Sequence, residues 1–296
     1  MCDSKKCIFC LNSIKELGEK NPFTIEHIIP KALGNSEIKL DCVCKNCNSK
    51  LGENIDAYFC NNTVVQLFRQ KLSLISYSGK IPNSFAKGKT EDGLTIITDN
   101  KFRRKIQPRI VESEDHRHII IDASSKEEAK SITLKKLSRL SISQEQIDKT
   151  LSEIDNTIPK KINPVIKYEL KMEINRLKLE ALKIAYELAI YVLGIKYLND
   201  VEAEKIRIIL KKAIDGEYKK DCPDFDFVFY GLNCKESFSF LNSLENKVHF
   251  FLIFKEQKSI NVFISLFASQ TFSFFIKVSD NADKYDINDT PIIIQL

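Results

Sequence analysis

Two cysteine pairs of the form C-x2-C lie close to the start of this 296-residue chain. They constrain the fold more than any other feature of the sequence. The first pair is CIFC at residues 7–10, and the second is CKNC at residues 44–47. Four thiolates in two such knuckles suit tetrahedral zinc, since each short loop lets two sulfurs approach one ion at about 2.3 Å. Four buried free thiols are the alternative. We expect a structural zinc ion, held by Cys7, Cys10, Cys44 and Cys47.

The spare cysteines of this region are Cys2, Cys42 and Cys60. Cys42 could compete with Cys44 for the ion, but the C-x2-C register with Cys47 favours Cys44. We expect the three spare cysteines to serve as small hydrophobic filling. A zinc ion would also help a block of about 55 residues that is too small to stabilise itself through a large core.

Composition indicates a soluble globular protein, with 43% hydrophobic and 29% charged residues. The net charge of +5 is compatible with a polyanionic partner but does not establish one. The polar start MCDSKKC has no apolar core after it, so no signal peptide is expected. The longest apolar run, 184–198, is broken by Glu187 and Lys196 and is too short for a membrane span. We therefore expect a cytoplasmic protein without membrane association, whose cysteines are metal ligands or buried thiols.

The hydrophobic periodicity predicts an α+β protein with two domains. A turn-rich passage at 77–93 separates an N-terminal domain, 1–76, from a larger α+β domain, 77–296, with long helices and a C-terminal antiparallel meander. The larger domain could recognise a target, sense a ligand or form a dimer. Helical patterns occupy 63–76, 165–198 and 202–215, with further helix starts near Ser124 or Ser125 and at Ser143. Strand patterns occupy 94–98, 105–112, 116–122, 225–231, 247–254, 260–267 and 271–278.

Between the knuckles lies EHIIPKALGN (26–35), and the second knuckle lies within VCKNCNSKLGENID (43–56). With the two C-x2-C pairs, these segments resemble the HNH, or ββα-metal, endonucleases, in the branch that reads EHIIPxALG, then VCxxCNxxxG, then D. The resemblance covers about residues 5–60. It implies a small zinc-stapled ββα-metal head and metal-dependent hydrolysis of phosphodiester bonds.

The resemblance also implies roles for three residues. Glu26 and Asn48 occupy the positions of the metal ligands, and both offer oxygen donors, which suit Mg²⁺ or Mn²⁺ more than zinc. His27 fits the general base, since a neutral imidazole can take a proton from water near neutral pH. The alternative for His27 is a hydrogen-bonded residue at a strand end. The two zinc knuckles that flank His27 make catalysis the stronger hypothesis.

The chain departs from the family pattern at two points. Many members carry histidine where this chain has Asn48, which implies a weaker site for a harder ion. The middle asparagine of the family name has no clear counterpart, because Lys39, Asp41 and Asn35 all lie near its place, and the role stays unassigned. Asp56 could orient the site or could be a solvated helix residue.

Three further sets of polar residues have both a functional and a simpler interpretation. Cations gather between residues 80 and 109, where they could follow nucleic-acid phosphates or form a solvated face. His116 and His118 would share a strand face, but an exposed strand end is commoner than a metal pair. His249 lies in an apolar strand and is expected to be structural. The cations are Lys80, Lys87, Lys89, Lys101, Arg103, Arg104, Lys105 and Arg109.

The sequence thus predicts an HNH endonuclease that acts on DNA, with structural zinc and a catalytic Mg²⁺ or Mn²⁺. An HNH head joined to an unfamiliar second domain resembles bacterial antiviral defence effectors and restriction-like nucleases. Two alternatives stay open. One is a zinc-stabilised nucleic-acid-binding or adaptor protein that no longer cuts, and the other is a nuclease gated by a ligand or partner. A homodimer is a further option, since cutting both strands ordinarily requires two sites.

Overall fold

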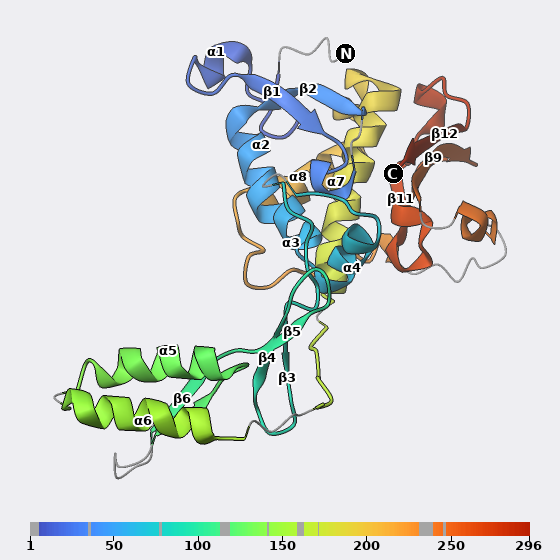
Figure 1. Cartoon of the computed structure of the whole chain (residues 1–296). Helices are drawn as coiled ribbons and strands as arrows, with labels where there is room; N and C mark the ends of the chain where they lie inside the picture. The colour runs from blue at the N-terminus through green and yellow to red at the C-terminus, as the bar shows by residue number, and fades with distance from the viewer. Residues whose placement is uncertain are drawn as a thin grey trace. The chain divides into compact units, whose positions relative to one another are not determined.

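The computed structural model of the protein forms two compact units. Unit 1 comprises Met1–Pro82 and Lys171–Leu296, and unit 2 comprises Asn83–Leu170. Both combine helices with antiparallel sheets, which confirms the predicted α+β class (Figure 1). No helix in the part of the chain described here is long and apolar enough to cross a membrane. The described residues are 6–34, 37–76, 79–112, 119–140, 142–158, 163–170, 172–230, 239–244 and 247–296.

This division differs from the expected boundary between residues 76 and 77. The second half of the chain returns to the N-terminal segment and shares its core. The Tyr186 hydroxyl donates to the carbonyl of Ile8 at 2.7 Å, and the Asn54 amide donates to the carbonyl of Ile214 at 2.8 Å. The physical reason is the small size of the zinc-knuckle block, which cannot form a hydrophobic core alone. Its apolar side chains are buried against later helices instead.

The N-terminal segment of unit 1 forms a hairpin followed by a helix. Strands β1 (Phe23–His27) and β2 (Lys39–Cys44) pair antiparallel, and α2 (Lys45–Leu51) begins directly after β2. Cys44 is the N-cap of α2, so the second knuckle spans the strand-to-helix junction. The remaining helices are α1 (Ile14–Leu17), the 3₁₀ turn Lys31–Leu33, the π-helical turn Gly52–Asp56, α3 (Ala57–Cys60) and α4 (Thr63–Lys71).

The later segment of unit 1 supplies two helices and a sheet. The sheet is antiparallel with strand order β12-β9-β10-β11-β8, which contains the predicted meander. The elements are α7 (Ile174–Leu193), α8 (Val201–Ile214), β8 (Val228–Tyr230), β9 (Val248–Glu256), β10 (Ser259–Ser265), β11 (Ser273–Ser279) and β12 (Thr290–Gln295). The 3₁₀ turns are Ile195–Asn199, Ser239–Leu244, Leu266–Ala268, Gln270–Phe272 and Ala282–Lys284.

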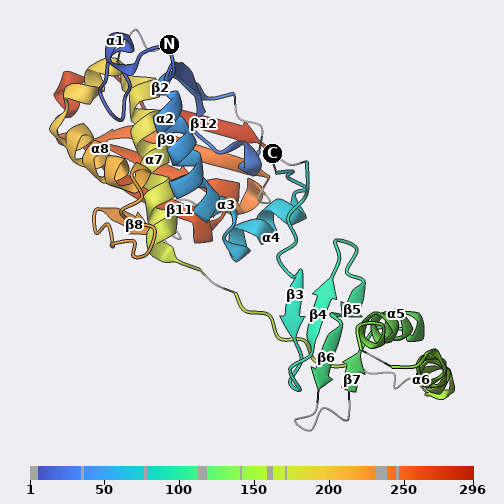
Figure 2. The same cartoon turned by 90° about the vertical axis from the view of Figure 1, so that its left-hand side faces the viewer.

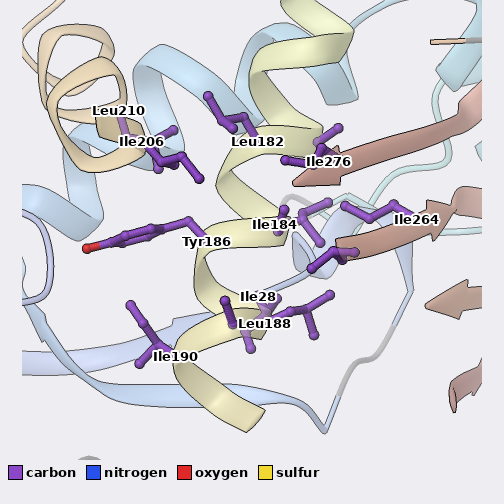
Figure 3. Packing of buried hydrophobic residues seen from close by; sticks show 14 of the residues in the cluster. Ile28, Leu182, Ile184, Tyr186, Leu188, Ile190, Ile206, Leu210, Ile264 and Ile276 are labelled. Carbon is purple, nitrogen blue, oxygen red and sulfur yellow. The ribbon is translucent and has the colours of Figure 1, made fainter. Parts of the chain in front are cut away.

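Helix α7 is the central element of unit 1. It contacts β8, β10 and β11 of the sheet, and it also contacts β2 and α3 of the N-terminal segment (Figure 2). Ile184 points toward Ile264 of the sheet, whereas Tyr186 points the other way, toward Ile206 of α8 (Figure 3). A helix covered on both sides must be apolar around most of its circumference. Any charged residue on α7 therefore needs a specific partner.

His249 on β9 is a structural histidine, as expected. Its side chain is fully buried, Nε2 lies 3.0 Å from the carbonyl of Leu33, and Nδ1 accepts the backbone N–H of Phe267 at 3.0 Å. Both nitrogens are thus satisfied by a neutral ring that donates from Nε2. Burial lowers the pKa of His249 to about 4.

This lowered pKa predicts acid destabilisation of unit 1. Between about pH 6.5, the ordinary histidine pKa, and pH 4, the unfolded chain binds a proton that the folded chain does not, so stability falls as the pH falls. The loss at pH 5 relative to pH 7 should be about 2 kcal/mol from this residue. Urea unfolding of wild type and His249→Gln at both pH values would measure it. An identical pH dependence in the two proteins would contradict the assignment.

Unit 2 is built from short strands and two helices. Strands β3 (Lys87–Lys89), β4 (Thr95–Thr98) and β5 (Arg104–Ile106) form one antiparallel sheet. Strands β6 (Arg109–Glu112) and β7 (Ile119–Asp122) form a separate pair. Helices α5 (Lys126–Leu137) and α6 (Gln144–Asn156) pack on each other, with the predicted serine N-caps at Ser125 and Ser143. The histidines at 116 and 118 lie outside the described residues.

Candidate active site

The two knuckles bring their four cysteines together. The sulfurs of Cys7, Cys10, Cys44 and Cys47 all lie within 4.8 Å of one another. The Cys10 and Cys44 sulfurs are 3.9 Å apart, close to the spacing of about 3.8 Å that tetrahedral zinc–thiolate geometry requires. The backbone N–H of Cys44 also donates to the Cys7 sulfur at 3.4 Å, which favours a thiolate there. The donor set and its spacing fit zinc.

The spare cysteines stay out of this cluster. Cys42 lies in the hydrophobic core, as expected, but it is disulfide-bonded and not a free thiol, and it does not compete with Cys44. Cys60 is a buried free thiol, as expected. Cys2 lies outside the described residues.

Glu26 and His27 end strand β1 and face different surroundings. Side chains alternate along a strand, and the register of β1 shifts between Thr24 and Glu26. Glu26 is only 4% exposed and points into the core of unit 1, whereas His27 is half-buried. The pairing places Glu26 opposite Leu40 and His27 opposite Lys39.

The His27 ring is free to act on a ligand. Among the described residues, none makes a hydrogen bond to either ring nitrogen, so both can meet water or substrate. Burial lowers the pKa of His27, and the cations Lys31, Lys39 and Lys183 lower it further. The imidazole is therefore neutral at pH 7, which is the state a general base needs.

Asn48 lies on α2 beside the end of β1. Its Nδ2 donates to the carbonyl of Ile25 at 3.0 Å, the residue directly before Glu26. This hydrogen bond orients the amide, and it leaves the side-chain oxygen as the atom that could bind a cation. Helix α2 thereby brings Asn48 to the strand that carries Glu26 and His27.

The carboxylate of Glu26 is paired with a buried lysine from α7. The Nζ of Lys183 lies 3.0 Å from Glu26 Oε1 and 3.0 Å from Asp56 Oδ1, and it donates to the carbonyl of His27 at 3.4 Å. Lys183 is fully buried, and Glu187 lies 3.8 Å from it on the same helix. A single ammonium group thus joins both HNH-like segments to α7.

Charge in this cluster is unbalanced toward the acids. Burial alone would lower the pKa of Lys183, but Asp56, Glu187 and Glu26 together hold it well above its ordinary value, so the lysine stays charged. Burial raises the pKa of Glu26 to about 7, and the attraction of Lys183 limits that rise. Burial also raises the pKa of Glu187 well above its ordinary value, and that of the equally buried Glu180. Burial thus favours the protonated form of both helix glutamates.

Lys183 has no counterpart among the candidate residues drawn from the sequence. The available signal was a set of charges at 180, 183 and 187, which helical spacing places on one face of a largely apolar segment. Asp56 pairs with Lys183 and is 19% exposed at its side chain, so it is not a solvated helix residue. The candidates for the unassigned asparagine role, Lys39 and Asp41, are exposed on β2, and Asn35 lies outside the described residues.

This geometry combines a zinc knuckle, a β-hairpin with His27 at its first strand's end, and a helix that carries Asn48 against that strand. Residues 7–64 match the family model of the HNH endonucleases. The HNH match confirms the resemblance seen in the sequence and supports a nuclease-type function. It runs from the first zinc knuckle to the start of α4, so Lys183 and the rest of unit 1 lie beyond it. No curated protein and no solved structure matches the chain.

Proposed function

We propose that the protein is a metal-dependent HNH endonuclease that hydrolyses phosphodiester bonds in DNA. The observation that carries this proposal is the state of His27, which is half-buried, neutral, and without a hydrogen-bonding partner for its ring nitrogens in the described structure. His27 lies at the end of β1, next to the residue whose neighbour Ile25 accepts a hydrogen bond from Asn48. His27 is the general base that removes a proton from the attacking water. By analogy with defence and restriction-like nucleases, foreign DNA is the natural substrate.

Glu26 and Asn48 would hold the divalent ion. A carboxylate and an amide oxygen form a hard donor set that suits Mg²⁺ or Mn²⁺. When bound, the ion supplies charge stabilisation at the phosphate and the leaving oxygen. Lys183 holds Oε1 of Glu26 and the carbonyl of His27, so it orients the ligand and the base as one assembly. Hydrogen-bonded partners of this kind commonly orient metal-ligating carboxylates.

Substitution of His27 by alanine should lower the cleavage rate by about 10²–10⁴-fold, the usual contribution of a general base. The assay is conversion of supercoiled plasmid to nicked and linear forms with Mg²⁺ or Mn²⁺, and the nicked-to-linear ratio reports whether one or two strands are cut. Ile25→Ala is the matched control, because that side chain is exposed on the same strand. His27→Ala should retain the zinc content and the melting temperature of wild type. Undiminished cleavage by His27→Ala would overturn the proposed base.

A second candidate function is a nucleic-acid-binding adaptor that does not cut. The burial of Glu26 against Lys183 favours it, because a carboxylate committed to an ammonium group is a weaker metal ligand. DNA binding without cleavage across Mg²⁺, Mn²⁺ and Ni²⁺ would select this alternative. Cleavage by wild type would exclude it.

A further inference from the structure

Unit 2 exposes one face of its three-stranded sheet. Antiparallel register aligns Lys87 on β3 with Ile97 on β4 and Lys105 on β5, and it aligns Lys89 with Thr95. Residues in register across neighbouring strands point to the same face, as do residues two apart on one strand. Lys87, Lys89 and Lys105 therefore share a face, and all three are exposed.

A fourth lysine joins this face from the chain segment beside β3. Lys167 and Lys89 form an antiparallel bridge, so their side chains lie on the same side. The other side of the sheet is covered: a Cβ atom at Gly88 would lie 2.4 Å from Ile166 and 2.8 Å from Tyr168. The apolar residues of this segment thus pack on one face, and its lysine is left on the opposite, open face. We call this face the lysine face: Lys87, Lys89, Lys105 and Lys167.

The lysine face is poorly neutralised. Lys167 pairs with Glu91 at 3.0 Å, but both groups are largely exposed. No ion pair joins Lys87, Lys89 or Lys105 to an acidic side chain in the described part of unit 2. Like charges directly opposite each other, such as Lys89 and Lys167, destabilise a sheet. An arrangement that costs stability in the free protein is stabilised when an anion binds.

The spacing of the cations favours a polyanion over a folded acidic partner. Lys87 and Lys105 are two strands apart, about 10 Å, and Ile97 lies between them. Ile97 is half-buried, and none of the residues paired in register on this face is an aromatic of the kind that anchors protein–protein interfaces. Without such an anchor, the lysines can attract only a negatively charged ligand. The repeated phosphates of a nucleic acid provide negative charge along their length and do not require a shaped pocket.

We propose that the lysine face of unit 2 binds the phosphate backbone of DNA without reading its sequence. This inference rests on the proposed function, because it identifies a second contact for the same substrate. Its energy is electrostatic, so it must weaken steeply with salt. It also gives unit 2 a role, as the part of the chain that adds affinity for DNA.

The test compares two triple variants in the full-length chain, both in the His27→Ala background and without added divalent ions. One is Lys87→Gln, Lys89→Gln, Lys105→Gln. The control removes as many exposed cations from the helical side of unit 2, through Lys135→Gln, Arg139→Gln and Lys149→Gln. Fluorescence anisotropy with duplex DNA, from about 50 to 200 mM salt, gives the slope of log K against log salt.

The lysine-face variant should lower the magnitude of that slope by about two to three, since each lost phosphate contact removes about 0.9. The control should change it by less than one. Equal effects of the two variants would overturn the proposal, and so would a slope that changes with RNA but not with DNA. Plasmid cleavage by the wild-type protein tests the nuclease separately, so the nuclease could stand while the lysine face fails.

Discussion

Replacement of Lys183 by methionine is expected to destabilise unit 1 by about 3–5 kcal/mol and to abolish cleavage at neutral pH. Methionine keeps the length of the side chain but removes the charge that lies 3.0 Å from both Glu26 and Asp56. Two buried or partly buried carboxylates are then left without a cation. Removing one partner of a buried ion pair is far more costly than removing an exposed one.

The effect should depend on pH in a defined direction. The pKa of Glu26 is already raised to about 7 by burial, with Lys183 opposing the rise, so the variant raises it further. A folded-state pKa above the unfolded value of about 4.3 means that stability falls as the pH rises through the folded pKa. Lys183→Met should therefore be more strongly destabilised at pH 8 than at pH 6. At pH 7 its Glu26 is protonated and binds a cation poorly.

Thermal unfolding at pH 6 and pH 8 and Mn²⁺ binding by calorimetry would measure both consequences. Lys178→Met is the matched control, because Lys178 lies on the same helix and pairs with the largely exposed Asp224 at 2.7 Å. It should cost less than about 1 kcal/mol and leave Mn²⁺ affinity unchanged. Lys183→Arg should restore part of both losses through its charge. If Lys183→Met binds Mn²⁺ as tightly as Lys178→Met does, Lys183 does not orient Glu26.

Much of the local structure could be predicted from the sequence because it depends on near neighbours. The C-x2-C spacing places two sulfurs on one ion whatever the rest of the chain does. Serine N-caps at Ser125 and Ser143 begin α5 and α6 where they were predicted, because the cap satisfies backbone groups within four residues. Alternating apolar residues likewise located β8, β9, β10 and β11 of the C-terminal sheet, but the edge strand β12 was not predicted.

The boundary of unit 1 could not be predicted in this way. It depends on contacts such as Tyr186 with Ile8 and Lys183 with Glu26, whose partners are more than 150 residues apart in the sequence. The local hydrophobic pattern of a segment does not show which distant residues it will contact. The predicted length of the long helix was also wrong. The helical pattern covers residues 165–198, but the helix spans Ile174–Leu193 and ends at Gly194, whose φ is 77°. An apolar helix predicts burial, but not which surfaces cover it.

The sequence indicated which residues could form the candidate site, but it did not indicate the ionic surroundings of those residues. The HNH resemblance located Glu26, His27 and Asn48, and the structure places all three at or against the end of β1. It did not foresee that Glu26 faces an ammonium group from α7. The match to the family ends at residue 64, so a motif comparison cannot identify Lys183, which lies outside the matched residues.

Loss of zinc is expected to unfold the N-terminal part of unit 1 and to weaken the rest. Structural zinc contributes apparent binding energies of about 10–16 kcal/mol in small domains, which is comparable to the whole stability of a typical domain. Cys47→Ser removes one of four ligands and leaves a poor donor in a buried site. Because strand β2 and helix α3 contact α7, disorder in the knuckles also removes packing from that helix.

The measurement combines metal analysis with near-ultraviolet circular dichroism in the tyrosine band, since the chain has nine tyrosines and no tryptophan. Cys222→Ser is the matched control, because Cys222 is also a buried free thiol but lies outside the four-sulfur cluster. It should keep one zinc ion per chain and a cooperative melting transition. Cys47→Ser should lose both, and a strong chelator should convert wild type to the same state. If Cys47→Ser kept its zinc and its melting temperature, the four-sulfur cluster would not be what holds the hairpin to α2.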